Sequence, residues 1–230
     1  MTTTRATADQ LQRLATFSTC ELADALIKLK YPTGGYLPDL AQYSGDDGRT
    51  LVGEAFTVEM VHCSDEEAPK LHGHFVDLAE PGTIVLVSTP PWVKSASLGG
   101  LLATALKVKG VKGFVTSGRC RDFAELREIG LPVFARGHSI LGQSPFTRVS
   151  RVQVSLTFPN DLDPFLFPAT EVNPYDLIVA DQDGAMVIRP GLVEEVMDLA
   201  GKGREVDRKC KADLLKGKGV EETFKLHRGK

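Results

Sequence analysis

Three short apolar runs alternate with two helical patterns in the middle of this 230-residue chain, and this alternation most constrains the fold. Each run is apolar at consecutive positions, as in a strand whose two faces are both covered. The runs are Ile84–Val87, Phe114–Thr116 and Pro132–Ala135, and helices are expected over Leu101–Lys109 and Phe123–Ile129. Strands that alternate with helices indicate a mixed α/β fold.

The flanking segments extend this pattern. Capping boxes that begin at Thr7 and Ser18 predict two short helices within residues 1–35. A charged helical arm is expected over residues 191–230, and the whole chain, residues 1–230, is expected to form one domain. The remaining predicted elements are strands over residues 52–61 and 152–157, a helix over 66–78, a turn at 117–118 and a β-hairpin around 181–184.

Composition and charge argue against several classes of protein. The net charge of −3 gives no reason to expect a nucleic-acid partner. No apolar stretch approaches the ~18 residues that span a bilayer, so no membrane partner is expected. The first ten residues lack the apolar segment of a secretory signal. Four widely spaced cysteines without a CxxC pair are typical of reduced thiols, which favours a cytoplasmic location.

The segment from Gly99 to Asp122 carries the groups that suit a small anionic substrate. Gly99 and Gly100 open the central helix, whose first N–H groups are free to bind an anion. Arg121 can hold a carboxylate through two parallel hydrogen bonds, and Asp122 can hold a hard divalent cation. Their order along the chain suggests one site at the end of a sheet.

Each of these features also has a purely structural interpretation. The two glycines could form only a tight turn before the helix. Arg121 could lie on the surface, with Asp122 as the N-cap of the following helix. Cys120, between two arginines, could have a lowered pKa, although no paired base is evident.

The segment from Gly99 to Gly137 resembles the RraA-like family. This family includes 4-hydroxy-4-methyl-2-oxoglutarate aldolases, related oxaloacetate decarboxylases and the ribonuclease E inhibitor RraA. The resemblance extends to Ser18–Leu26, Pro81–Ser88 and Val172–Ile188, and the tail from Asp207 to Arg228 resembles that of fungal members. It implies a compact α/β/β fold, similar to swivelling domains, with subunits assembled as a homotrimer or hexamer and the active site in a cleft between them.

The resemblance also implies a role for individual residues. Arg121 would bind the substrate and Asp122 would contact Mg²⁺ (or Mn²⁺), so that both are catalytic. An acidic residue from a neighbouring subunit's C-terminal helix would approach the metal through water; Asp207 is the best match and Glu205 the second. The residues implied to bind the substrate carboxylate, besides Arg121, are Gly99, Gly100, Leu101 and Leu102.

Two positions depart from the family pattern that the resemblance implies. Gly100 stands where the aldolases carry an acid, and Ser117 replaces the usual aspartate before the glycine.

Because the Arg121–Asp122 pair is retained, the resemblance implies a divalent-metal-dependent lyase. Such an enzyme would cleave a C–C bond of a short 2-oxo acid through a pyruvate enolate, as an oxaloacetate decarboxylase or a 4-hydroxy-4-methyl-2-oxoglutarate aldolase does. The alternatives are a non-catalytic RraA-like binding or regulatory protein and a pathway-recruited enzyme with altered chemistry.

Overall fold

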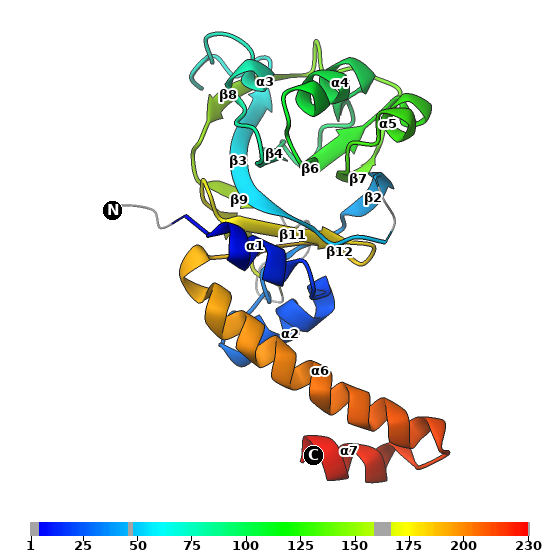
Figure 1. Ribbon diagram of the computed structural model, residues 1–230. Coiled ribbons are helices and arrows are strands. Elements are labelled where there is room, and N and C mark those ends of the chain that lie inside the picture. The colour runs from blue at the N-terminus through cyan, green and yellow to red at the C-terminus, as the bar shows by residue number, and fades with distance from the viewer. Residues whose placement is uncertain (1–4, 46–47, 159–166, 230) are drawn as a thin grey trace.

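The computed structural model describes residues 5–45, 48–158 and 167–229, and its organising element is the long strand β3 (Leu51–His62) (Figure 1). The first part of β3 pairs antiparallel with β11, and the second part pairs parallel with β4 and antiparallel with β8. The sheet order is β1-β12-β11-β3-β4-β6-β7-β2. The other strands are β1 (Tyr36–Leu37), β2 (Ala41–Ser44), β4 (Ile84–Ser88), β5 (Ala96–Leu98), β6 (Gly113–Cys120), β7 (Val133–His138), β8 (Thr147–Val152), β9 (Leu156–Phe158), β10 (Thr170–Val172), β11 (Leu177–Asp181) and β12 (Gly184–Ile188).

The three apolar runs are strands, as predicted, and they form the parallel centre of the sheet. Strands β4, β6 and β7 lie parallel to one another and to β3. The predicted helices connect them, and the predicted hairpin is the antiparallel pair β11–β12. The helices are α1 (Ala8–Leu14), α2 (Thr19–Lys28), α3 (Phe75–Leu78), α4 (Gly100–Val108), α5 (Phe123–Ile129), α6 (Val193–Leu215) and α7 (Val220–Arg228).

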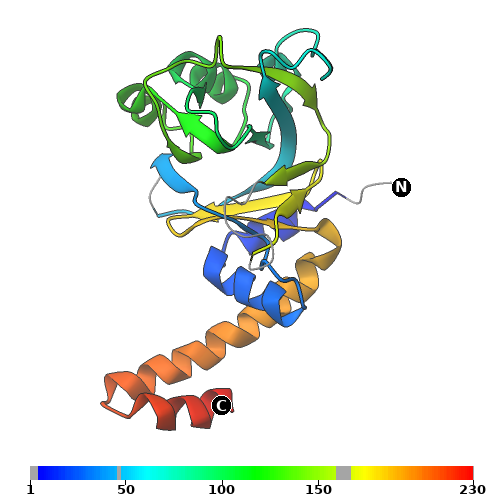
Figure 2. The same cartoon turned by 180° about the vertical axis from the view of Figure 1, so that it is seen from behind.

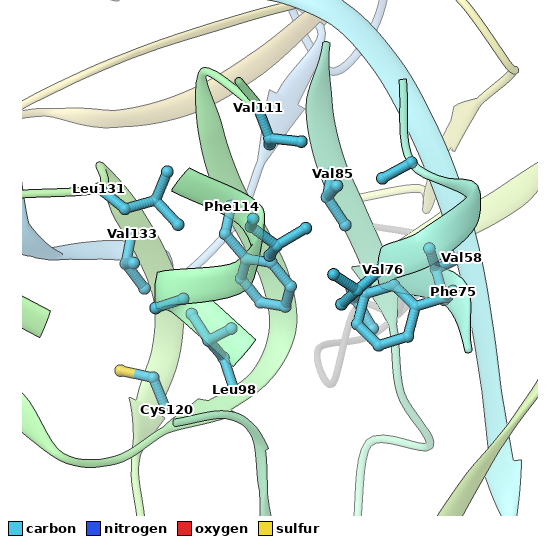
Figure 3. Close-up of a cluster of buried hydrophobic side chains, with 14 of the residues drawn as sticks. Val58, Phe75, Val76, Val85, Leu98, Val111, Phe114, Cys120, Leu131 and Val133 are labelled. Carbon is cyan, nitrogen blue, oxygen red and sulfur yellow. The ribbon is translucent and has the colours of Figure 1, made fainter. Parts of the chain in front are cut away.

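Three buried clusters define the layers. One lies between helices α3–α5 and the parallel strands, and includes Phe75, Val85 and Phe114 (Figure 3). A second lies between the two halves of the curled sheet and includes Ile84 and Leu86. Neighbouring residues of β4 thus enter opposite clusters, which explains its continuous apolar run. A third cluster lies between the hairpin β11–β12 and helices α1, α2 and α6 (Figures 1 and 2). The result is an α/β/β fold whose outer sheet is also covered by helices.

The terminal helices begin as the capping boxes predicted. The side chains of Thr7 and Ser18 each accept a hydrogen bond from the backbone N–H three residues later, and both boxes are complete. Helix α6 runs without a break through Gly201 and Gly203, and α7 then folds back beside it (Figure 1). Within the described residues, no helix combines the length and apolar character needed to cross a membrane.

The predicted helix over residues 66–78 is wrong, because only its last turn, α3, is helical. The backbone carbonyls of Asp65, Ala68 and Pro69 accept hydrogen bonds from the guanidinium of Arg148, at 2.5, 2.7 and 2.6 Å. A helix would use these carbonyls for its own ladder. A long-range contact with β8 therefore replaces local helix formation.

Two strand predictions also need correction. The chain does not turn at 117–118, because β6 continues to Cys120 with a register shift between Thr116 and Arg119. The side chain of Ser117 accepts a hydrogen bond from the N–H of Thr89, which anchors this irregular part of the strand. The strand expected over residues 152–157 is split into β8 and β9 at Gln153, whose φ is 52°.

Candidate active site

The candidate site lies where two adjacent parallel strands end. Strand β5 ends at Leu98 and β6 ends at Cys120, and these two residues are paired in the sheet. The next residues along each strand are therefore brought together, and the N–H of Arg121 donates to the carbonyl of Leu98 at 3.0 Å. The carboxyl edge of a parallel sheet is a frequent place for ligands in α/β proteins.

Asp122 is held in a conformation that few residues adopt. Its φ of 64° and ψ of 46° are left-handed, which aspartate tolerates better than most side chains. It is the N-cap residue of α5, and its backbone carbonyl accepts the N–H of Leu126 at 2.9 Å, but its side chain makes no capping hydrogen bond. Instead, its Oδ2 accepts the N–H of Gly100 on α4 at 3.0 Å. Asp122 is therefore more than a helix cap, because its carboxylate joins α5 to α4.

Gly99 permits the Arg121–Asp122 pair to lie against the start of α4. A Cβ atom at residue 99 would lie 2.5 Å from Oδ2 of Asp122 and 3.1 Å from Nε of Arg121. The backbone of Gly99 is extended, with φ −136°, so its role is not a special turn. Glycine is needed here because any side chain would enter the space of the arginine and the aspartate.

The first turn of α4 faces this pair with free donors. Gly99 is its N-cap and provides no side-chain hydrogen bond. The N–H of Gly100 is taken by Asp122, whereas those of Leu101 and Leu102 have no partner in the part of the chain that the structure describes. Free N–H groups and the helix dipole favour a bound anion. The role of residues 99–102 in binding a substrate carboxylate stays a prediction.

The guanidinium of Arg121 is available to a ligand. Its Nε lies 3.4 Å from Oδ2 of Asp122, and the two side chains are 39% and 40% exposed. An ion pair this exposed and this long is weak, so a substrate carboxylate can compete for the arginine. Gly142 leaves room for the guanidinium, since a Cβ there would lie 3.0 Å from its Nη1.

Arg119 is engaged elsewhere. Its Nη1 donates to the backbone carbonyl of His138 at 2.9 Å, across the β6–β7 pair. The guanidinium also lies against Gly137, where a Cβ would come within 2.7 Å of Nη1. The two arginines on either side of Cys120 therefore differ, because one fixes strand β7 and the other faces the helix terminus.

The residues at the site fit a weakly held hard cation. One oxygen of Asp122 is hydrogen-bonded, and the other has no partner among the described residues. The described residues include no group of three or more His, Cys, Asp or Glu side chains placed to hold a metal. Magnesium accepts one protein carboxylate with water and substrate oxygens as its other ligands. The donor set therefore suits magnesium or manganese better than zinc.

Asp207 and Glu205 lie on α6, away from the site of their own chain (Figure 1). Asp207 accepts a hydrogen bond from Arg228 of α7 at 2.6 Å, and Glu205 pairs with Arg208 at 3.1 Å. The single chain does not bring either acid to Arg121. A role for them at a neighbouring subunit's site remains a prediction.

Cys120 is a core residue and not a nucleophile. Its side chain is buried beside Leu98 in the cluster under α4 and α5 (Figure 3). Burial raises the pKa of this thiol to about 12. The flanking arginines do not offset this effect, because both guanidinium groups point away to other partners.

Sequence reasoning missed one carboxylate that lies beside the candidate site. Glu125, on α5, places its side chain against Gly100, in the space that a Cβ at residue 100 would fill. No local signal marks it, because the contact joins α5 to the first residue of α4. Gly142 was missed as well, and only the folded loop shows that it borders Arg121.

Comparisons with known proteins establish the family. A family model described as RraA-like, Aldolase/RraA, matches residues 19–187, so this chain belongs to the RraA-like family. A protein of Halalkalibacterium halodurans, provisionally named a 4-hydroxy-4-methyl-2-oxoglutarate aldolase, is 27% identical over 203 residues, which cover 88% of this chain and 87% of that protein.

Solved structures share the fold. An uncharacterized protein from Pseudomonas syringae is 24% identical, with a TM-score of 0.77 over 96% of this chain and 98% of that one. Streptomyces coelicolor RraAS2, described as an unusual member of the RNase ES inhibitor RraA family, is 23% identical, with a TM-score of 0.72 over 89% of this chain and 96% of that one. The relatives thus include both a named aldolase and a member of an inhibitor family.

Proposed function

We propose that this protein is a divalent-metal-dependent lyase that cleaves a C–C bond of a short 2-oxo acid. The observation that carries the proposal is the convergence of Arg121, Asp122 and the open N-terminus of α4 at the end of two parallel strands. The guanidinium of Arg121, the unpaired second oxygen of Asp122 and the free N–H donors of α4 together suit a small dianionic substrate bound with a metal ion. The aldolase name of the bacterial relative agrees with this chemistry.

Cleavage of such an acid leaves negative charge on the oxygen of a pyruvate enolate. A bound divalent cation supplies a Lewis acid for that charge. Arg121 holds the carboxylate and the 2-oxo group by charge-assisted hydrogen bonds. The N–H groups of Leu101 and Leu102 orient the carboxylate at the helix terminus, and Asp122 would hold the cation.

Two reactions both require stabilisation of the enolate charge, but they differ in whether they also need a base. Decarboxylation of oxaloacetate needs charge stabilisation but no base. Retro-aldol cleavage of 4-hydroxy-4-methyl-2-oxoglutarate also needs a group that takes the proton of the 4-hydroxyl. Position 100, which carries an acid in the family's aldolases, is glycine in this chain.

The direct test measures pyruvate released from each acid by the purified protein, with Mg²⁺ or Mn²⁺ and with a chelator. Metal-dependent release from either acid is expected. If neither acid is cleaved with either metal, the lyase proposal fails. The alternative function, a non-catalytic binding protein as the inhibitor-family relative suggests, would then be favoured.

We further propose that the site is completed by a neighbouring subunit in a homotrimer or hexamer. In the single chain, Leu101 on the first turn of α4 is 84% exposed, and Ile140, in the loop that borders Arg121, is 91% exposed. Only the first part of α6 packs on the body, through Val193, Val196 and Met197. The far part of the arm leaves apolar side chains exposed, namely Leu215, Val220 and Leu226.

Light scattering at micromolar concentration is expected to give the mass of three or six chains. Burial of the exposed arm residues against a neighbour would drive this association. Leu215→Glu and Leu226→Glu together are expected to shift the mass toward the monomer, whereas Lys211→Glu, on the exposed face of α6, should have little effect. A monomeric mass for the wild-type protein would contradict this assembly.

A further inference from the structure

The side chain of Glu125 lies over Gly100, at the first turn of α4. A Cβ atom at residue 100 would overlap both carboxylate oxygens and the carboxyl carbon of Glu125. The carboxylate of Glu125 thus occupies the space that the side chain of residue 100 would enter. The absence of a side chain at Gly100 thus leaves room for Glu125, whose carboxylate reaches the start of α4 from α5.

The surroundings of this carboxylate suit a role in the site. Glu125 is exposed, and it has no hydrogen bond or ion pair in the part of the chain that the structure describes, so its oxygens are open to a ligand. Gly100, the residue it covers, donates its N–H to Asp122 at 3.0 Å. Glu125 and Asp122 therefore lie against the same residue, with Leu101 and Leu102 next along the helix.

We propose that Glu125 is the acid–base residue of this site and supplies from α5 the carboxylate that position 100 lacks. The inference rests on the proposed lyase function and concerns retro-aldol cleavage. The O–H bond of the 4-hydroxyl breaks and its proton passes to Glu125. The C3–C4 bond then breaks, its electron pair forms the pyruvate enolate, and C4 becomes the carbonyl carbon of the second product. Glu125 returns the proton to C3, which gives pyruvate.

Glu125→Gln separates this role from a structural one, because oxaloacetate decarboxylation has no hydroxyl proton to remove and water can protonate C3 of its enolate. At saturating Mn²⁺, the variant is expected to lower kcat for retro-aldol cleavage about 10²-fold and kcat for decarboxylation less than about threefold. Glu128→Gln, on the same helix and exposed, is the matched control and should behave like the wild type. A general loss of fold would reduce both reactions together.

Gly100→Ala tests the steric relation without altering the carboxylate itself. The added methyl group displaces the flexible end of Glu125, so the melting temperature should change little while retro-aldol kcat falls as in Glu125→Gln. The pair Gly100→Asp with Glu125→Ala restores a carboxylate from α4. It is expected to recover about tenfold of the activity that Glu125→Ala loses.

Mn²⁺ binding, measured by electron paramagnetic resonance, supplies a readout independent of turnover. Loss of one negative charge beside Asp122 should weaken Mn²⁺ binding about three- to tenfold in Glu125→Gln and not in Glu128→Gln. If the wild type cleaves both acids and Glu125→Gln matches Glu128→Gln, the inference fails while the lyase function stands. If the wild type cleaves neither acid, the lyase function fails, and equal Mn²⁺ affinity of the two variants would also remove Glu125 from the site.

Discussion

Replacing Asp122 with alanine is expected to abolish lyase activity, with a loss of about 10³-fold or more in kcat/KM. Asp122 is the carboxylate that both meets Arg121 and accepts the N–H of Gly100. Its removal takes away the negative charge that would hold the cation and frees the N–H of α4. Steady-state kinetics with saturating Mg²⁺ would measure the loss.

The same variant should remain folded. Alanine in the left-handed conformation of residue 122 costs about 1 kcal/mol, which corresponds to a fall of about 2–4 °C in Tm. Asp122→Asn is the sharper companion, because asparagine tolerates this conformation and keeps an oxygen for the N–H of Gly100. It should be nearly as inactive as alanine if the charge is what matters. A chelator-treated wild type that kept its full rate would contradict the metal-dependent mechanism.

Arg121→Lys is expected to lower kcat/KM by roughly ten- to a few hundred-fold. Lysine keeps the positive charge but loses the planar fork that holds a carboxylate through two hydrogen bonds. Such charge-assisted bonds are worth about 1.5–3 kcal/mol, at about 1.4 kcal/mol per factor of ten. The Tm of this variant should change little, because the guanidinium is 39% exposed and its ion pair with Asp122 is long.

Arg119→Lys is the matched control, since Arg119 precedes the pair by two positions and binds the carbonyl of His138 instead of facing α4. Its replacement should cost clearly less activity, on the order of threefold or less, and should act on stability through the β6–β7 contact. Kinetics of both variants on oxaloacetate would compare them. If the two variants lose activity equally, the assignment of Arg121 to substrate binding is wrong.

Local patterns determined most of the secondary structure at the centre of the fold. The buried strands were predictable because each is apolar at consecutive positions, and both faces of β4 do enter buried clusters. The two N-terminal helices were predictable because capping boxes are local hydrogen-bond patterns. The helix predicted over residues 66–78 failed because its carbonyls bind Arg148, a partner distant in the chain.

The arginine and the aspartate of the candidate site could be named from the sequence, because Arg121 and Asp122 are adjacent residues that resemble a family motif. Short β-strands such as β1, β5 and β10 could not be predicted from the sequence, since two or three residues carry no periodicity. Helix α7 was expected only as part of a continuous arm, and it is separate because the chain reverses before Val220.

The amino-acid sequence by itself determined the α/β pattern, the Arg121–Asp122 pair and the glycine-opened helix, because each depends on residues close together in the chain. The three-dimensional packing was needed to show that the side chain of Asp122 binds the N–H of Gly100 instead of an N–H of its own helix, and that Glu125 lies over Gly100. Both contacts join α5 to α4. Their geometry follows from how β5 and β6 pair and where they end, a long-range register that local sequence does not encode.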